Sequence, residues 1–258
     1  MKSRHAPRRL RLTGVVILAA LLGLVSACEK EPDALALPDA RAFFLPRSGP
    51  SGAALAFRVD SVVYDPAVGG TARLASASTW TLERADADPA DTTATSTAAL
   101  FRVTARDTSG RRGGDFLWDW IADDRSVSNR LDGVEHLSLL APLIPGTAWS
   151  SLPEAELDRE IAVAGEPVAI HKGWGQARID SVATYTLPTG TAVEAVYVTL
   201  SEAENLLELR EYREVYGRDL GLLERRVRIL DTQVTDASIP WSERAERGFE
   251  LALKRSGL

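Results

Sequence analysis

The chain has 258 residues, of which 36 are acidic and 30 are Lys or Arg, so its formal net charge is −6. An acidic surface opposes binding to phosphate backbones, and we therefore expect no nucleic-acid partner. Cysteine occurs once, which excludes an intrachain disulfide framework and a multi-cysteine zinc site. The length suffices for one sizeable domain or two small ones.

The N-terminal segment has the composition of a secretory signal. Its first eleven residues hold five basic side chains and no acidic one, and residues 14–24 are apolar or glycine throughout. This run is shorter than the roughly 20 residues that cross a bilayer as a helix. We therefore predict a signal peptide over 1–27. Its removal would leave 25 basic and 36 acidic residues, a net charge of −11.

Cys28 follows this segment directly. The run Leu24-Val25-Ser26-Ala27-Cys28 resembles the lipobox of bacterial lipoproteins. The resemblance implies a diacylglycerol thioether on Cys28, cleavage before that residue, acylation of the new amine and thus a membrane attached through lipid. Three acyl chains would make the attachment permanent, because each buried methylene contributes about 0.8 kcal/mol. The residue after the cysteine is Glu29 and not Asp, which by the sorting rule of diderm lipoproteins points to the outer membrane. The domain could lie on either the periplasmic or the external face of that membrane.

Residues 28–52 are interpreted as the lipidated cysteine and a tether, and 53–258 as a β-rich domain. Alternating apolar and polar residues predict strands through the first half of this domain. The expected strands are 55–64, 72–83, 100–105, 116–122 and 134–140, with a hairpin turn around 109–114.

The second half continues in the same style. Strands are expected at 161–163, 168–171, 177–183, 192–200 and 220–230, with a turn at 187–190. Residues 206–216 could extend a helix capped at Ser201, or form a strand that turns at Gly217; we favour the strand. A short C-terminal helix is expected over 243–254, because Ser242 can cap it and Phe249 and Leu253 share one helical face.

Two segments of the domain are similar to each other. Residues 58–62 (RVDSV) recur as 178–182 (RIDSV), and each is followed by a turn and a Thr-Ala pair. Two readings stay open: chance similarity of two amphipathic strands, or duplication into related halves 53–152 and 153–258. The predicted fold class is mainly β, with antiparallel sheets arranged as a sandwich or a half-barrel.

Three stretches carry a resemblance to a wider group: 57–65 (FRVDSVVYD), 142–149 (PLIPGTAW) and 215–225 (VYGRDLGLLER). In this order they resemble an uncharacterised group of β-rich outer-membrane lipoproteins from Bacteroidota and related diderms. Gly217 and Asp219 depart from the turn that is usual in that group. The resemblance implies a β-rich envelope lipoprotein and brings no activity and no catalytic residue.

Candidate functional residues are few. The sequence contains no HExxH, CxxC or GxSxG motif, so no catalytic residue, metal site or cofactor is predicted. His136 is interpreted as a strand residue and His171 as a turn residue. Trp118 and Trp120 share one face of a strand. If exposed they would form an aromatic platform for a ligand, and if buried they belong to the core, which is the commoner case.

A group of charged residues surrounds the expected turn at Gly217. We expect these side chains to meet across two strands as a solvated, salt-bridged face. They are Glu211, Arg213, Glu214, Arg225, Arg226 and Arg228.

The sequence supports three functional hypotheses. The first is a non-enzymatic, membrane-anchored envelope protein with a binding or scaffold role, whose partner is another envelope component. The second is a carrier for a lipid or other apolar ligand, with the 243–254 helix as a lid. The third is a glycan-acting enzyme. A carrier requires an apolar cavity, an enzyme requires clustered acids or histidines in a cleft, and a scaffold requires a filled core.

Overall fold

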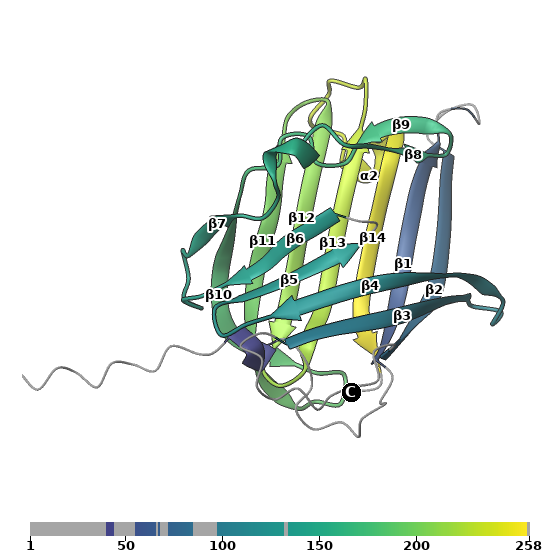
Figure 1. Ribbon diagram of the computed structural model, residues 1–258. Helices are drawn as coiled ribbons and strands as arrows, with labels where there is room; N and C mark the ends of the chain where they lie inside the picture. Colours follow the sequence, from purple (N-terminus) through teal and green to yellow (C-terminus); the bar gives the residue numbers. More distant parts are fainter. Residues whose placement is uncertain are drawn as a thin grey trace, which may run out of the picture. The chain divides into compact units, whose positions relative to one another are not determined.

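The computed structural model describes residues 40–43, 55–65, 67, 72–84, 97–131 and 134–256. The predicted signal peptide and Cys28 lie outside these residues. Strands dominate the described part of the chain (Figure 1). In chain order they are β1 (Leu55–Asp65), β2 (Ala72–Arg84), β3 (Thr97–Asp107), β4 (Arg112–Ala122), β5 (Ser126–Leu131), β6 (Val134–Leu140), β7 (Ala148–Ser150), β8 (Glu160–Val163), β9 (Glu166–Ala169), β10 (Gln176–Thr186), β11 (Ala192–Glu204), β12 (Glu208–Gly217), β13 (Gly221–Asp231) and β14 (Arg247–Ser256).

Twelve of these strands form one antiparallel sheet. Its order is β6-β5-β4-β3-β2-β1-β14-β13-β12-β11-β10-β7, and β8 and β9 form a separate hairpin. So long an open sheet curls, because each strand is rotated relative to its neighbour in the same sense. As a result, β3–β6 lie across β11–β14 (Figure 1). The mainly β fold class is confirmed, with one folded-over sheet supplying both layers.

The two ends of the sheet come together. The backbone N–H of Leu137 in β6 donates to the carbonyl oxygen of Ser151, next to β7, over 2.9 Å. The indole Nε1 of Trp149 in β7 donates to the carbonyl oxygen of Leu137 over 2.7 Å. These bonds hold the sheet nearly closed as a barrel-like layer around its core.

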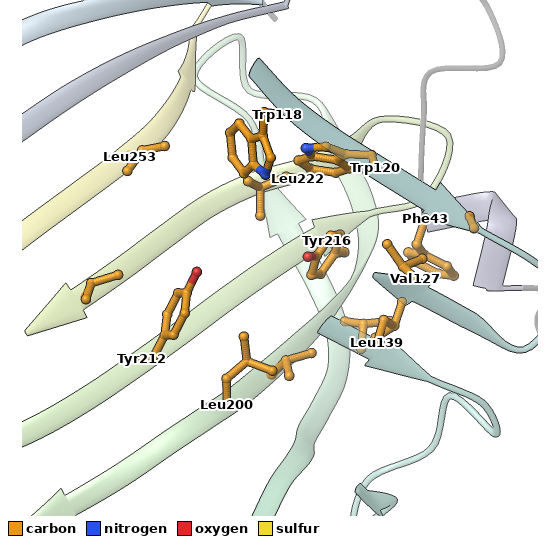
Figure 2. Close-up of a cluster of buried hydrophobic side chains, with 14 of the residues drawn as sticks. Phe43, Trp118, Trp120, Val127, Leu139, Leu200, Tyr212, Tyr216, Leu222 and Leu253 are labelled. Carbon is orange, nitrogen blue, oxygen red and sulfur yellow. The ribbon is translucent and has the colours of Figure 1, made fainter. Parts of the chain in front are cut away.

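The main hydrophobic core lies between the two layers (Figure 2). Alternation places Phe57 and Val59 of β1 on this inner side. A smaller cluster lies on the opposite face of β1 and β13, where Tyr64 and Leu230 pack under the short helix α2 (Trp241–Arg244). Loop residues thus bury part of the outer face as well.

A short 3₁₀ helix, η1 (Ala40–Phe43), closes one end of the core. It falls within the predicted tether but packs on the domain: the Asp219 N–H donates to the Ala42 carbonyl oxygen over 2.6 Å. Phe43 is fully buried beside Val127 and Leu139 (Figure 2). The β8–β9 hairpin lies at the opposite end of the layers (Figure 1).

The expected helix over 243–254 is wrong in its extent. The only helical residues there are Trp241–Arg244, and β14 occupies most of the predicted range. Phe249, Leu251 and Leu253 follow a period of two, which suits a strand as well as Phe249 and Leu253 suit a helix. Tertiary context decides between them, because β14 bonds to β1 on one side and β13 on the other.

Residues 206–216, which could have formed either a helix or a strand, lie mostly in strand β12. The favoured prediction of a strand is therefore confirmed. β5 and β7 are not among the strands predicted from the sequence. In β5 Val127 contributes an apolar side chain to the core, while Asn129 faces inward and accepts a hydrogen bond from Trp118. A strand with a polar inner side chain gives no alternating hydrophobic signal.

Duplication of the domain stays a prediction. The repeated segments open β1 and β10, and from each the meander proceeds through successive strands in the same direction along the sheet. In each copy the arginine pairs with the aspartate two residues later. The distances are 3.1 Å for Arg58–Asp60 and 2.9 Å for Arg178–Asp180.

Candidate ligand pocket

A pocket of about 260 Å³ opens between the two layers, toward the end covered by the β8–β9 hairpin. Strand β6, the segment 159–174 and the inner faces of β12, β13 and β14 form its walls. We call it the histidine pocket. Its lining residues are Val134, His136, Arg159, Ile161, Ile170, His171, Trp174, Tyr212, Arg225, Val227, Ile229, Phe249 and Leu251.

Four aromatic rings form one wall of this pocket. The His136 ring centroid lies 5.5 Å from that of His171, 5.8 Å from Trp174 and 5.9 Å from Tyr212. Trp174 meets Tyr212 at 5.2 Å with the ring planes nearly perpendicular. Such edge-to-face contacts fix ring orientation. The cluster thus joins β6 and β12, from opposite layers, to the turn after β9.

Hydrogen bonds hold two of these rings in place. His171 Nδ1 lies 2.9 Å from the Glu156 carbonyl oxygen, so we assign the proton to Nδ1. The Trp174 indole donates to Ser151 Oγ over 2.9 Å. By contrast, Nδ1 of His136 is buried without a hydrogen-bond partner among the described residues. Its ring packs against the rings of His171, Trp174 and Tyr212.

Both histidines are held in the neutral form. Burial lowers the pKa of His136 to about 3, and the positive charges of Arg225 and Arg159 add to this effect. Burial also lowers the pKa of His171, although the bond to Glu156 opposes the shift. An imidazole with a pKa near 3 is uncharged at neutral pH.

A buried ion pair forms the inner end of the pocket. Arg225 Nε donates to Glu214 Oε1 over 2.7 Å, and the two side chains are 3% and 0% exposed. Tyr216 donates its hydroxyl to the other Glu214 oxygen over 2.7 Å. The guanidinium carbon of Arg225 lies 4.6 Å from the Trp118 ring centroid. Burial alone would lower the pKa of Arg225, but the adjoining carboxylate reverses this and raises it.

The predicted charged face therefore divides in two. Arg213 and Arg226 are about half exposed and belong to a surface network, as predicted. Glu211 pairs with both Arg213 and Arg228 at 3.3 Å, but its own side chain is only 10% exposed and is not solvated as predicted. For Glu214 and Arg225 the prediction of a solvated face is wrong, because strand alternation turns both residues inward.

The two tryptophans do not form an exposed platform. Trp118 is 0% and Trp120 is 3% exposed, and their ring centroids lie 5.0 Å apart. Figure 2 shows both within the buried cluster near Leu222. They belong to the core because β4 lies in the layer that covers β12 and β13, so its inward face meets no solvent.

The histidine pocket itself is not foreseen from the sequence. His136 is a strand residue and His171 a turn residue, as predicted, but they are 35 residues apart and share no motif. The one feature of the sequence that could have indicated the site is that histidine is rare. Only these two histidines follow the predicted signal peptide, and both line the same pocket. Among the described residues, no group of three His, Cys, Asp or Glu side chains could hold a metal ion.

A second hollow, of about 430 Å³, lies on the outer face over β1, β2, β13 and β14. Ala75, Ala77 and Ala252 contribute to its lining. The flanking charges are already paired with each other, as Arg228 and Glu250 show at 3.5 Å. Charges of both signs thus line this hollow, whereas no acidic side chain is among the described residues that line the histidine pocket.

In the described part of the chain, no helix is both long and apolar enough to cross a membrane. No protein-family model matches the sequence, and no curated protein matches it. A solved structure that is similar belongs to a Bacteroides fragilis protein described as exported and as having a YmcC-like fold. The similarity covers 83% of this chain and 97% of that one, with 10% identity and a TM-score of 0.36. At this level it carries no inference about function.

Proposed function

We propose that the protein is a non-enzymatic, lipid-anchored component of the bacterial cell envelope that holds a small apolar ligand in the histidine pocket. The observation that carries this proposal is the pocket itself. A scaffold would fill the space between its layers, whereas here an apolar and aromatic-lined space of about 260 Å³ is left. Such concave, largely apolar sites with a few polar groups are typical of small-molecule binding.

The protonation state of the pocket favours binding over catalysis. A general acid or base works best when its pKa lies near the operating pH, and burial lowers the pKa of His136 to about 3. No Asp or Glu is among the described residues that line the pocket. The carboxylate pair of a glycan-acting enzyme therefore has no counterpart at this site.

The carrier hypothesis loses its proposed lid, because 247–256 is a strand in the sheet. The β8–β9 hairpin covers that end of the layers instead, and its Ile161 is 36% exposed at the pocket. The β8–β9 hairpin therefore takes the place of the predicted helical lid at the histidine pocket.

Lipid attachment is supported by the resemblance of 24–28 to a lipobox. An acidic mature chain gains little from anionic lipid headgroups, so acyl chains on Cys28 would have to provide the membrane affinity. The proposed address is the outer membrane, on the strength of Glu29.

Cys28→Ala is expected to abolish incorporation of labelled palmitate, because no other thiol in the chain can take the diacylglycerol. Metabolic labelling followed by immunoprecipitation measures this. Ser26→Ala is the matched control and should keep its label, since it leaves a small residue before the cleavage site. Label retained in the Cys28→Ala chain would contradict lipid attachment at this residue.

Leu251→Trp is expected to weaken the binding of a neutral apolar dye, N-phenyl-1-naphthylamine, by at least about tenfold. Leu251 lines the pocket from β14, and the larger ring would occupy the ligand's space. The measurement is a fluorescence titration of the mature chain, residues 28–258, carrying Cys28→Ala so that no lipid is attached.

Leu117→Trp makes the same side-chain change at a residue that is 55% exposed and does not line the pocket. It should leave dye affinity unchanged. Equal affinity in both variants would place the dye elsewhere and count against the pocket as the binding site. Thermal unfolding of both variants checks that each remains folded.

A further inference from the structure

We propose that the ligand of the histidine pocket is a small amphipathic carboxylate. Its anionic head would lie among His136, Arg159 and Arg225, and its apolar part along β13 and β14. This inference rests on the proposed binding function and assigns the class of ligand.

The charge of the pocket wall is opposite to that of the whole protein. Two arginines and two histidines line the pocket, and no acidic side chain is among the lining residues that the structure describes. The chain as a whole carries a net charge of −6. The carboxylates that balance the arginines, Glu214 and Glu156, pair with them from outside the lining. An anionic group in the pocket would therefore meet cations and neutral donors only.

Polar and apolar groups occupy different parts of the wall. Along the inner face of β13, Arg225 is followed by Val227 and then Ile229. In the register with β14, Val227 pairs with Leu251 and Ile229 with Phe249. Four residues along a strand span about 13 Å. The wall thus changes from a guanidinium at the inner end to four apolar side chains, which fits a molecule with one charged end.

A buried nitrogen supplies a second, independent observation. His136 is 7% exposed, and its Nδ1 has no hydrogen-bond partner among the described residues. Buried polar atoms in native proteins are nearly always hydrogen-bonded, because an unpaired one loses its water without compensation. A carboxylate oxygen in the pocket could accept a hydrogen bond from this Nδ1 in the corresponding tautomer. A purely apolar ligand would leave the nitrogen unpaired.

Cationic surroundings also explain why the ligand should be an anion and not a neutral acceptor. Arg225 and Arg159 both act to disfavour a positive charge on His136, and no acidic side chain is among the described residues that line the pocket. The same field favours a negative charge placed next to the ring. Charge-assisted hydrogen bonds from Arg or His to a carboxylate are stronger than neutral ones.

The test compares octanoate with 1-octanol, which share a chain length and differ in the charge of the head. Isothermal titration of the mature Cys28→Ala chain at pH 7.5 should show octanoate binding at least about tenfold tighter. The comparison is repeated with 1-naphthoate and 1-naphthalenemethanol, so that the result does not depend on chain shape.

Two variants locate the head group. Arg159→Gln should reduce the preference for octanoate by about fivefold or more while leaving octanol affinity unchanged. His136→Phe, which replaces the imidazole by an apolar aromatic ring and so removes both ring nitrogens, should do the same. Arg130→Gln is the matched control: Arg130 is 46% exposed, pairs with Glu135 and does not line the pocket. It should leave the preference intact.

The outcomes separate the two proposals. If octanol and 1-naphthalenemethanol bind as tightly as their acids, the carboxylate assignment is overturned, while an apolar binding function stands. An acid preference that is equal in wild type, Arg159→Gln and His136→Phe also overturns the assignment. If no acid, alcohol or neutral dye binds, the proposed function fails together with it.

Discussion

Gly248→Ala is expected to lower the free energy of unfolding by about 4 kcal/mol or more, a large share of the roughly 5–15 kcal/mol by which an ordinary domain is stable. Gly248 has a φ of +110°, a conformation that side chains rarely adopt. A Cβ built there would lie 1.9 Å from the carbonyl oxygen of Ile229. The obstacle is backbone, so no side-chain rotation relieves it.

The position of Gly248 in the sheet explains the size of this effect. It pairs with Leu230 of β13 on one side and with Tyr64 of β1 on the other. Relief of the clash would have to separate two central strands and disturb the cluster under Trp241. The substitution would therefore destabilise the neighbouring strands of the sheet as well as the residue itself.

Urea unfolding followed by tryptophan fluorescence measures this change. Gly114→Ala is the matched control, because Gly114 also lies in a strand, has no positive φ and has open space where a Cβ would be. It should change the stability little or raise it slightly. If both variants unfold at the same urea concentration, the close approach at Gly248 is not a determinant of the fold.

Glu214→Leu is expected to cost about 3–5 kcal/mol, because it leaves the guanidinium of Arg225 buried without its carboxylate. The effect arises from desolvation, since both side chains lie inside the sheet and Tyr216 supplies the remaining hydrogen bond to Glu214. The double variant Glu214→Leu/Arg225→Met should recover most of the loss. Replacing both members of a buried pair by apolar residues is often close to neutral.

The surface network provides the comparison. Glu202→Gln removes the charge that pairs with both Arg178 and Arg213, whose side chains are 43% and 48% exposed, and should cost less than about 1 kcal/mol. The same urea experiment on all three variants separates the cases. A double variant as unstable as Glu214→Leu would mean that the loss comes from packing at residue 214 and not from the unpaired charge.

The alternation of apolar and polar residues was sufficient to predict a strand where that strand has one apolar face. The alternation of Phe57 and Val59 with polar neighbours predicted β1 closely, and 134–140 matches β6. It failed where the inward side chain is polar, as at Asn129 in β5. It was also insufficient where two periods fit the same residues, as in 243–254.

The candidate site was harder to foresee than the fold. Trp118 and Trp120 were candidates for an aromatic platform because they are two residues apart and share one face of a strand, yet that strand lies in the covering layer and both are buried. His136 and His171 were predicted only as a strand residue and a turn residue, because neither belongs to a motif in its own segment. Their proximity depends on β6 being folded across β12, a contact between residues far apart in the sequence.

The sequence by itself determined the strand-rich composition, most strand positions, the acidic charge and the lipobox-like segment that ends at Cys28. These follow from residues that are neighbours in the chain, where period and composition act directly. Only the tertiary structure decided which charges are buried, that β14 is a central strand, and that two histidines and two arginines line one pocket. Those outcomes depend on how a twelve-stranded sheet curls until its ends meet, and curling brings together side chains whose spacing in the sequence carries no signal.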